Sequence, residues 1–320
     1  MPQFADYLRL MLPRRRAQWS IGIYVGATPL QLAPHPAIGS EPVLTPQSLD
    51  GIKASGVADP FMMRHGQGWL MFFEVENLLS GRGEIGLATS PDALSWRFEG
   101  IVLKEPFHLS YPHVWECDGA FYMLPESSGA GSLRLYKSTS FPFDWKFHKE
   151  LMQGRIADAT PFHHEGRWWM FALEGFRESD LMNIYYAEHP EGPWRGHSAN
   201  PVLRGNRRAA RPAGRVIRHE GALIRFAQDY EGVYGRAVRA FGIDQLTPET
   251  FVEHAIGAPE ILGPSGRGWN ATGMHHIDAH QRGPGDWIAC VDGRRTVPYL
   301  PVLDVIRSRI HRAGIKGHAS

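Results

Sequence analysis

The sequence predicts an all-β fold, a five-bladed β-propeller whose last blade is closed by N-terminal strands. Three observations support this prediction. A strand–turn–strand pattern recurs along the chain, its copies are about 50 residues apart, and the first and last parts of the chain carry complementary halves of one repeat. Strands and turns with such a period are typical of propeller blades, because one blade cannot bury both faces of its sheet alone.

The repeat is clearest from Gly56 to Glu74, where a strand after Asp59-Pro60 leads through a turn to a second strand that ends in an acid. Similar stretches run over 110–126, 157–174, 210–229 and 270–292. Prolines at 60, 112, 161 and 212 mark the first four copies, in steps of 52, 49 and 51 residues. The fifth copy lacks this proline, so its register is set by the strands alone.

The remaining strands follow in order. Residues 19–45 resemble the third and fourth strands of the first blade, whereas the fifth copy has no clear third or fourth strand. We therefore expect the N-terminal strands to complete the fifth blade, which removes exposed sheet edges. The predicted parts are an N-terminal arm at 1–18, a propeller at 19–293 and a C-terminal tail at 294–320 with a helix over Val305–Arg312. The blades are predicted at 51–105, 106–153, 154–204, 205–262, and 19–48 joined to 263–293.

Composition limits the classes of function. Of 320 residues, 43% are hydrophobic and 21% charged, and the net charge is +1, so bulk charge indicates no nucleic-acid partner. No apolar run reaches the roughly 20 residues of a membrane span. Cys117 and Cys290 fall in different repeats, which predicts buried thiols in a reducing compartment, and we expect a cytoplasmic location. The basic segments at 14–16 and 306–312 are expected to be solvated helix faces, with contact to a membrane surface as the alternative.

One end of the propeller should collect the chemically active side chains. Adjacent strands in a blade are antiparallel, so the start of the first strand and the end of the second lie at the same end, near the axis. A pocket of carboxylates, aromatic rings and cations there would suit a hydroxyl-rich ligand such as a sugar. The residues predicted at this end are Asp59, Tyr111, His113, Asp158, Arg211, His275 and His276, together with the strand-end acids Glu74, Glu126, Glu174, Asp229 and Asp292.

The same residues carry a family resemblance. Over about 19–293 the chain resembles the five-bladed propellers of glycosidase family 43. It is still more similar to the N-terminal region of plant glucosamine inositolphosphorylceramide transferases and to bacterial stand-alone homologues of that region. The motifs that carry the resemblance are Ala58-Asp59-Pro60, the stretches 110–114 and 156–161, Arg211-Pro-Ala-Gly214, and Gly273-Met-His-His276.

The resemblance implies a mechanism with one member replaced. Family hydrolases invert with a base, a second aspartate and a glutamic acid, which implies Asp59 as base and Asp158 as its partner. The position of the acid carries Arg211, which stays protonated and cannot donate a proton usefully at neutral pH. Glu174, or else Glu126, is then expected to be the acid. Arg211 would lower the pKa of a neighbouring carboxylate or bind an anionic group of the ligand.

Three functional hypotheses follow. The first is a glycosidase-like enzyme that acts on a glycan or glycoconjugate, with Asp59, Asp158 and Glu174 as catalytic residues. The second is a non-catalytic glycan-binding module in polysaccharide or glycolipid biosynthesis, with a partner from a glycosyltransferase pathway. The third is a protein-interaction propeller, which predicts an apolar rim and no ring of acids. No cofactor is required. His275, His276 and Asp278 are expected to hydrogen-bond within the funnel wall, with an axial cation near the two histidines as the alternative.

Overall fold

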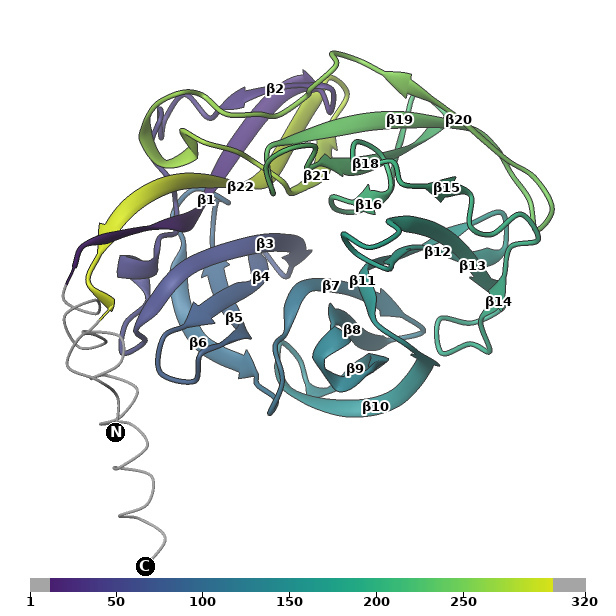
Figure 1. The fold of residues 1–320 in the computed structure, drawn as a ribbon, viewed down its shortest axis with the longest axis horizontal. Helices are drawn as coiled ribbons and strands as arrows, with labels where there is room; N and C mark the ends of the chain where they lie inside the picture. The colour runs from purple at the N-terminus through teal and green to yellow at the C-terminus, as the bar shows by residue number, and fades with distance from the viewer. Residues whose placement is uncertain (1–11, 302–320) are drawn as a thin grey trace, which may run out of the picture.

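Five antiparallel sheets stand around a common axis in the computed structural model, which describes residues 12–301 (Figure 1). The predicted all-β, five-bladed fold is therefore confirmed. Among the described residues, no helix has the length and apolar character that crossing a bilayer requires.

Four blades are each built from one continuous stretch of chain. The first contains β3 (Ala54–His65), β4 (Gly68–Asn77), β5 (Arg82–Ser90) and β6 (Arg97–Leu103). The second contains β7 (Ser110–Cys117), β8 (Ala120–Glu126), β9 (Ser132–Ser140) and β10 (Phe143–Gln153). The third contains β11 (Ile156–His164), β12 (Arg167–Glu174), β13 (Leu181–Ala187), β14 (Arg195–Gly196) and β15 (Leu203–Arg204). The fourth contains β16 (Arg211–Pro212), β17 (Ile217–His219), β18 (Ala222–Asp229), β19 (Ala237–Leu246) and β20 (Phe251–Ile256). Short 3-10 turns lie at η1 (Pro46–Ser48), η2 (Ser128–Ala130) and η3 (Gly268–Asn270).

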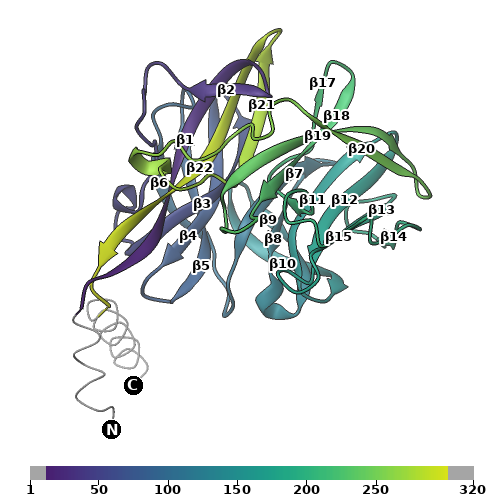
Figure 2. The same cartoon turned by 45° about the horizontal axis from the view of Figure 1, so that its top comes forward.

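The fifth blade joins distant parts of the chain, as predicted. Its strand order is β2 (Gln31–Pro34), β1 (Arg14–Thr28), β22 (Asp286–Tyr299) and β21 (Ile277–Gly283). The pairing of β1 with β22 runs without a break from Arg14 opposite Tyr299 to Gly26 opposite Trp287. This pair continues beyond the ring as a two-stranded ribbon, purple and yellow in Figures 1 and 2.

The ribbon corrects two predicted boundaries. Residues 14–18 and 294–299 belong to paired strands, although the sequence assigned them to an arm and a tail. The physical reason is exposure: apolar alternation marks a strand only where one face is buried, and most of these residues face solvent. The predicted helix over Val305–Arg312 lies outside the described residues.

The hydrophobic cores lie between blades, because side chains alternate between the two faces of each strand. In β4, Met71 and Phe73 pack with Ile21 of the fifth blade, whereas Phe72 packs with Val114 of the second blade. All five are buried. Every sheet is therefore stabilised by both neighbours, and this fixes where the inner strand ends meet at the axis.

Candidate functional site

The innermost strands of the first three blades share an unusual backbone conformation. Asp59, Tyr111 and Asp158 have φ angles of 50°, 48° and 49°. At each position the pairing with the second strand skips a residue pair, which indicates a bulge. Left-handed backbone costs about 1–2 kcal/mol for such residues, and strain of this kind is concentrated at functional sites. The three positions are thus equivalent in the repeat.

This equivalence corrects the alignment drawn from the prolines. Pro60 and Pro112 directly follow the left-handed residue, but in the third blade Ala159 takes that place and Pro161 lies two residues further on. The proline spacing therefore misaligned the third blade by two residues, because the bulge and not the proline defines the repeat.

The register also separates Glu174 from the other strand-end acids. Glu74 and Glu126 each lie opposite the residue that precedes the bulge. In the third blade Leu173 takes that place, and Glu174 lies one residue further along. A shift of one residue turns a side chain to the opposite face of a strand. The predicted equivalence of Glu174 is therefore wrong, and its carboxylate instead accepts a hydrogen bond from the Tyr185 hydroxyl.

A first group of site residues, which we call the histidine cluster, consists of Asp59, His275, His276 and Asp292. The Asp292 carboxylate accepts backbone N–H bonds from Asp59 at 3.1 Å and from both histidines at 3.0 Å. Its Oδ2 lies 2.7 Å from Nδ1 of His275, whose Nε2 lies 3.8 Å from the Asp59 carboxylate. The His275 ring stacks on Trp19 at 4.0 Å. Asp292 is thus the hub that orients the cluster.

Burial and charge act in opposite directions within this cluster. Burial raises the pKa of Asp59 well above its usual value, although His275 opposes the shift. For Asp292, burial is outweighed by His275 and by the backbone N–H groups, so its pKa is lowered. For His275, burial is outweighed by the carboxylates of Asp292 and Asp59, so its pKa is raised. Burial lowers the pKa of His276 to about 4. The stable charge pair is therefore Asp292 with His275.

A second group, the arginine cluster, consists of Glu126, Asp158, Arg211 and Gln228. Arg211 donates from Nε to Asp158, and its Nη2 lies 3.6 Å from the Glu126 carboxylate. The Gln228 amide also donates to Asp158, at 2.8 Å. Burial and the Asp158 charge raise the pKa of Glu126 to about 7, while Arg211 opposes the shift. Burial lowers the pKa of Arg211, but Asp158 outweighs it and the guanidinium stays charged.

The rings of Phe176 and Tyr234, which we call the aromatic roof, lie against the arginine cluster. The Arg211 guanidinium lies over the Phe176 ring at 4.4 Å and over Tyr234 at 5.3 Å. Arg177 also lies over both rings, at 5.1 and 5.5 Å. Tyr234 makes an edge contact with His275 at 5.4 Å, so the roof connects the two clusters. Tyr234 was not identified from the sequence, where only an aromatic residue beside glycine in a loop marks it.

Several other predicted residues are held by internal contacts. Glu74 pairs with Nε2 of His108 at 3.1 Å. Asp229 pairs with Arg236 at 2.7 Å and Arg239 at 2.8 Å within its own blade. Asp229 has no exposed surface, so the prediction that it binds substrate directly is corrected.

Tyr111 and His113 are also enclosed. The Tyr111 hydroxyl contacts Thr160 at 2.8 Å and accepts from the Gly214 N–H at 2.7 Å. His113 lies 3.1 Å from Arg215, deeper in the channel. Tyr111 is 0% exposed, His113 1% and His276 0%, so these side chains are too enclosed to touch a glycan directly.

Two groups of side chains within the described residues could hold a metal ion. In the first, Asp59, His275 and Asp292 offer ligand atoms within 4.8 Å of one another. The second is separate from the two clusters and contains Cys117, Asp118 and His189. Asp278, expected to hydrogen-bond within the funnel wall, pairs with Arg215 at 2.9 Å and His280 at 2.9 Å, so the alternative of a cation ligand is not met at this residue.

Comparison with solved structures agrees with the fold. An α-L-arabinanase from Cellvibrio cellulosa in complex with arabinohexaose superposes with a TM-score of 0.53, at 15% identity, over 76% of this chain and 94% of that one. An exo-1,5-α-L-arabinanase from a bovine ruminal metagenomic library gives 0.52, at 12% identity, over 70% and 86%. The chain thus has a propeller fold that glycoside hydrolases also use.

Relatives found by sequence have a higher identity to this chain than these solved structures. Glucosamine inositolphosphorylceramide transferase 1 of Oryza sativa subsp. japonica is 36% identical over 304 residues, which cover 89% of this chain and 41% of the rice protein. The protein of the same name from Arabidopsis thaliana is 34% identical, with coverage of 87% and 39%. The chain spans about two fifths of the length of these relatives. The family described as glucosamine inositolphosphorylceramide transferase 1, N-terminal, matches residues 13–294, and the chain belongs to this family.

Proposed function

We propose that the chain binds a glycan or glycoconjugate at the axial end of the propeller without hydrolysing it, as part of polysaccharide or glycolipid biosynthesis. The observation that carries this proposal is the buried ion pair of Arg211 with Asp158. The family resemblance implies that Arg211 takes the place of the hydrolases' proton donor. A guanidinium that stays charged cannot act as an acid, so this position contributes binding and not proton transfer.

The ligand would contact the aromatic roof and the two charged side chains at its rim, Arg177 and Glu126. Phe176 and Tyr234 are half-buried, Arg177 is exposed, and Glu126 is half-buried. Aromatic rings stack on the apolar faces of sugars, and carboxylate and guanidinium groups bind hydroxyl, carboxylate or phosphate groups. The buried aspartates below would hold the rim in place. The ligand class is therefore a sugar that carries an anionic or phosphorylated group.

The proposed role in glycolipid biosynthesis rests on the family to which the chain belongs. The transferases named among the relatives are longer than this chain, so their activity is not transferred to it. The propeller would bind the glycoconjugate that a partner glycosyltransferase extends. We place this role in the cytoplasm, where two free thiols are stable.

One observation favours a second candidate, a glycosidase-like enzyme. Glu126 has a pKa near 7, which is the range a general acid needs, and Asp59 would be the base. Asp158 and Arg211 would then set the charge of the acid. An inverting reaction requires the two carboxyl groups to lie roughly 6.5–9.5 Å apart with a water between them. Glu174, whose side chain faces another direction, is not needed in this mechanism.

The histidine cluster is also a candidate site for an axial cation. Asp59, His275 and Asp292 would hold it through two carboxylate oxygens and one imidazole nitrogen, a mixed donor set for a divalent ion. The ring nitrogens of His276, which lack hydrogen-bond partners among the described residues, are a further donor set. A bound ion would supply positive charge that lowers the pKa of Asp59. It would not be a redox metal.

The test combines binding with turnover. Wild-type protein is screened against immobilised glycans and aryl glycosides, beside Phe176→Ala, Glu126→Gln and Asp59→Asn. Binding that Phe176→Ala weakens about tenfold, with no turnover by any form, supports the binding role. Phe143→Ala, on a ring 44% exposed in β10, is the matched control. Turnover that Glu126→Gln abolishes would replace the binding role by the second candidate, and absence of both binding and turnover would reject both.

A further inference from the structure

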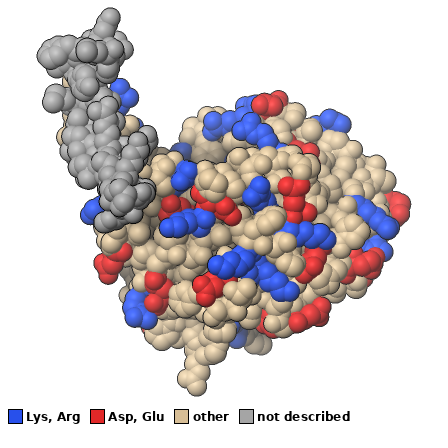
Figure 3. Space-filling model, turned by 90° about the horizontal axis from the view of Figure 1, so that it is seen from below, with Lys and Arg blue, Asp and Glu red and all other residues tan. Residues whose placement is uncertain are grey.

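The charge of the chain is divided between the propeller and the residues that flank it. Residues 1–18 and 293–320 together contain ten Lys and Arg and two Asp and Glu, a net charge of +8. Residues 19–292 contain 24 Lys and Arg and 31 Asp and Glu, a net charge of −7. The overall value of +1 hides this asymmetry. Figure 3 shows basic and acidic side chains mixed over one face of the propeller, so no comparable single-sign surface covers that face.

The described part of this basic region is the ribbon that β1 and β22 form beyond the ring, residues 12–18 and 293–301. It contains five arginines and no acid. Arg14, Arg15 and Arg295 are exposed. Arg294 instead fixes the root of the ribbon, because it donates to the backbone carbonyls of Tyr234 and Thr272. The prediction of a solvated helix face therefore fails for residues 14–16, which lie on a strand.

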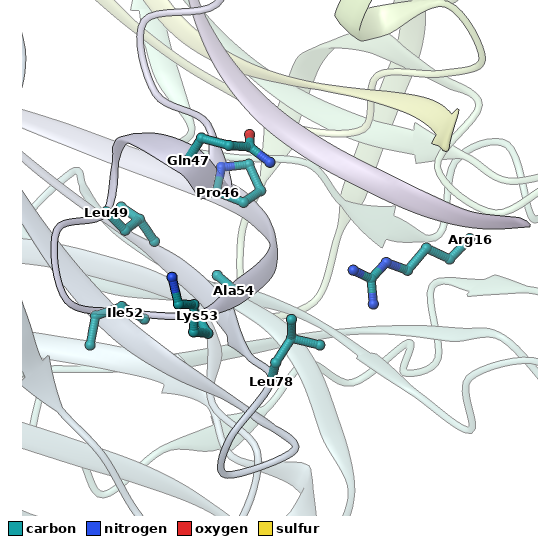
Figure 4. Close-up of a pocket in the computed structure, with 8 residues that line it drawn as sticks. All are labelled: Arg16, Pro46, Gln47, Leu49, Ile52, Lys53, Ala54 and Leu78. Atoms are coloured by element: carbon teal, nitrogen blue, oxygen red, sulfur yellow. The ribbon is translucent and has the colours of Figure 1, made fainter. Parts of the chain in front are cut away.

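Apolar groups accompany these charges. Leu12 and Leu300 at the far end of the ribbon are 61% and 38% exposed. At its root, a pocket of about 350 Å³ is lined by the cations Arg16 and Lys53 and by aliphatic side chains (Figure 4). The aliphatic and remaining lining residues are Pro46, Gln47, Leu49, Ile52, Ala54 and Leu78. Figure 4 shows Arg16 reaching in from β1 and Lys53 from the opposite wall.

We propose that the ribbon docks on the surface of an anionic phospholipid membrane. Clustered arginines attract anionic lipid surfaces, and exposed leucines beside them enter the interfacial layer. Nucleic acid would also attract arginine, but a lipid layer offers both anionic headgroups to the arginines and an apolar layer to the leucines. This inference goes beyond the proposed function and does not depend on it.

Docking would also orient the axial site. Beyond Asp292, β22 continues outward into the ribbon, and Asp292 is the hub of the histidine cluster. Trp19, at the root of the ribbon on β1, stacks on His275. The ribbon therefore leaves the propeller from the end that carries the two clusters. A membrane bound by the ribbon faces that end.

The test measures co-sedimentation with vesicles of phosphatidylcholine alone and of phosphatidylcholine with about 30% phosphatidylserine, whose surface potential attracts basic segments. We expect binding to the anionic vesicles only, and its loss when added salt screens the charges. Each basic residue near such a surface strengthens binding about fivefold, so the triple variant Arg14→Gln, Arg15→Gln and Arg295→Gln should weaken it about a hundredfold. The matched control removes three cations from outer strands, by Arg97→Gln, Lys146→Gln and Arg195→Gln, and should change binding less than about threefold.

Hydrogen exchange of the wild-type protein gives a second measurement that does not depend on a variant. Anionic vesicles should protect amides in residues 12–18 and 294–301 and leave β10 and β14 unchanged. Equal binding to both vesicle types, or unchanged binding by the triple variant, would overturn the proposal. Glycan binding retained by the triple variant would separate this outcome from a failure of the proposed function.

Discussion

The two clusters at the axis differ in how they compensate buried carboxylates. In the arginine cluster, a cation that stays charged at every accessible pH pairs with Asp158. In the histidine cluster, Asp59 and Asp292 accept backbone N–H bonds and lie beside imidazoles, whose charge depends on pH and on neighbours. The two groups lie in adjacent parts of one ring and share the Tyr234 contact.

The difference indicates a division of labour. A fixed ion pair holds geometry but offers little free charge, which suits a structural support beneath a binding surface. A cluster whose net charge can change is able to accept a proton or a cation. The ion pair of Arg211 with Asp158 is therefore expected to govern stability, whereas Glu126 beside that pair and the histidine cluster are expected to govern the response to pH. The following predictions test this contrast, starting with the largest effect.

Removing the guanidinium should have the largest effect. Arg211→Met leaves Asp158 buried without its counter-ion, which should lower the free energy of unfolding by about 3–5 kcal/mol. Urea unfolding at pH 7 measures this loss. The double variant with Asp158→Asn removes the orphaned charge and should recover part of the stability. A loss below about 1 kcal/mol in the single variant would contradict the structural role of the pair.

The two aspartates of the histidine cluster should respond differently to neutral substitution. Asp292→Asn weakens three backbone hydrogen bonds to a charged acceptor, which should cost about 2–3 kcal/mol at pH 7. Asp59→Asn should cost less than about 0.5 kcal/mol, because burial already disfavours the charge of Asp59. Thermal unfolding of both variants measures the difference. Equal losses would show that Asp292 is not the hub.

Glu126 should lower stability when it ionises. Its pKa is about 7 in the folded state against an ordinary value of 4.5, so its favourable contribution is complete below pH 4.5 and is lost as pH rises to about 7. Glu126→Gln should therefore match wild type at pH 4 and exceed it by about 1–2 kcal/mol at pH 8. Unfolding measured at both pH values tests this. A constant difference between the two would show that Glu126 does not titrate in this range.

The smallest effect should be the pH dependence that His275 contributes. Its pKa is raised on folding, so its stabilising contribution is complete below pH 6.5 and is lost as pH rises through the folded value. His275→Gln should be less stable than wild type by about 1 kcal/mol at pH 6, and the gap should close at higher pH. NMR titration of the imidazoles should find His275 protonated above pH 6.5 and His276 titrating near pH 4. The reverse order would be incompatible with the hub role of Asp292.

Most of the fold could be predicted from the sequence, because it rests on periodicity. The strand–turn–strand repeat gave the blade count, and the incomplete last copy gave the closure. Local sequence could not locate the bulges, since left-handed backbone at Asp59, Tyr111 and Asp158 has no single residue signature. Glu174 was misassigned for the same reason: one residue of register decides which face a side chain takes, and composition does not encode it.

The site was predictable only in part. Position at strand ends correctly gathered Asp59, His275 and His276, and also Asp158 with Glu126 and Arg211.

For the other residues, burial and interaction partners decided whether the side chain belongs to the site. Asp229 lies at a strand end too, but two arginines of its own blade neutralise it. Gln228 and Trp19 were missed, because an amide beside a strand-end acid and a tryptophan in a strand look like ordinary structural residues.

The closure of the ring has a consequence for biosynthesis. Ile23 pairs with Cys290, so the first long strand must wait for a partner made near the other end of the described chain. At about 5–20 residues per second, a ribosome needs on the order of 15–60 s to deliver that partner. Until then the nascent β1 has an unsatisfied edge that invites pairing with other chains. A basic, acid-free beginning to β1 provides charge repulsion between copies during this interval.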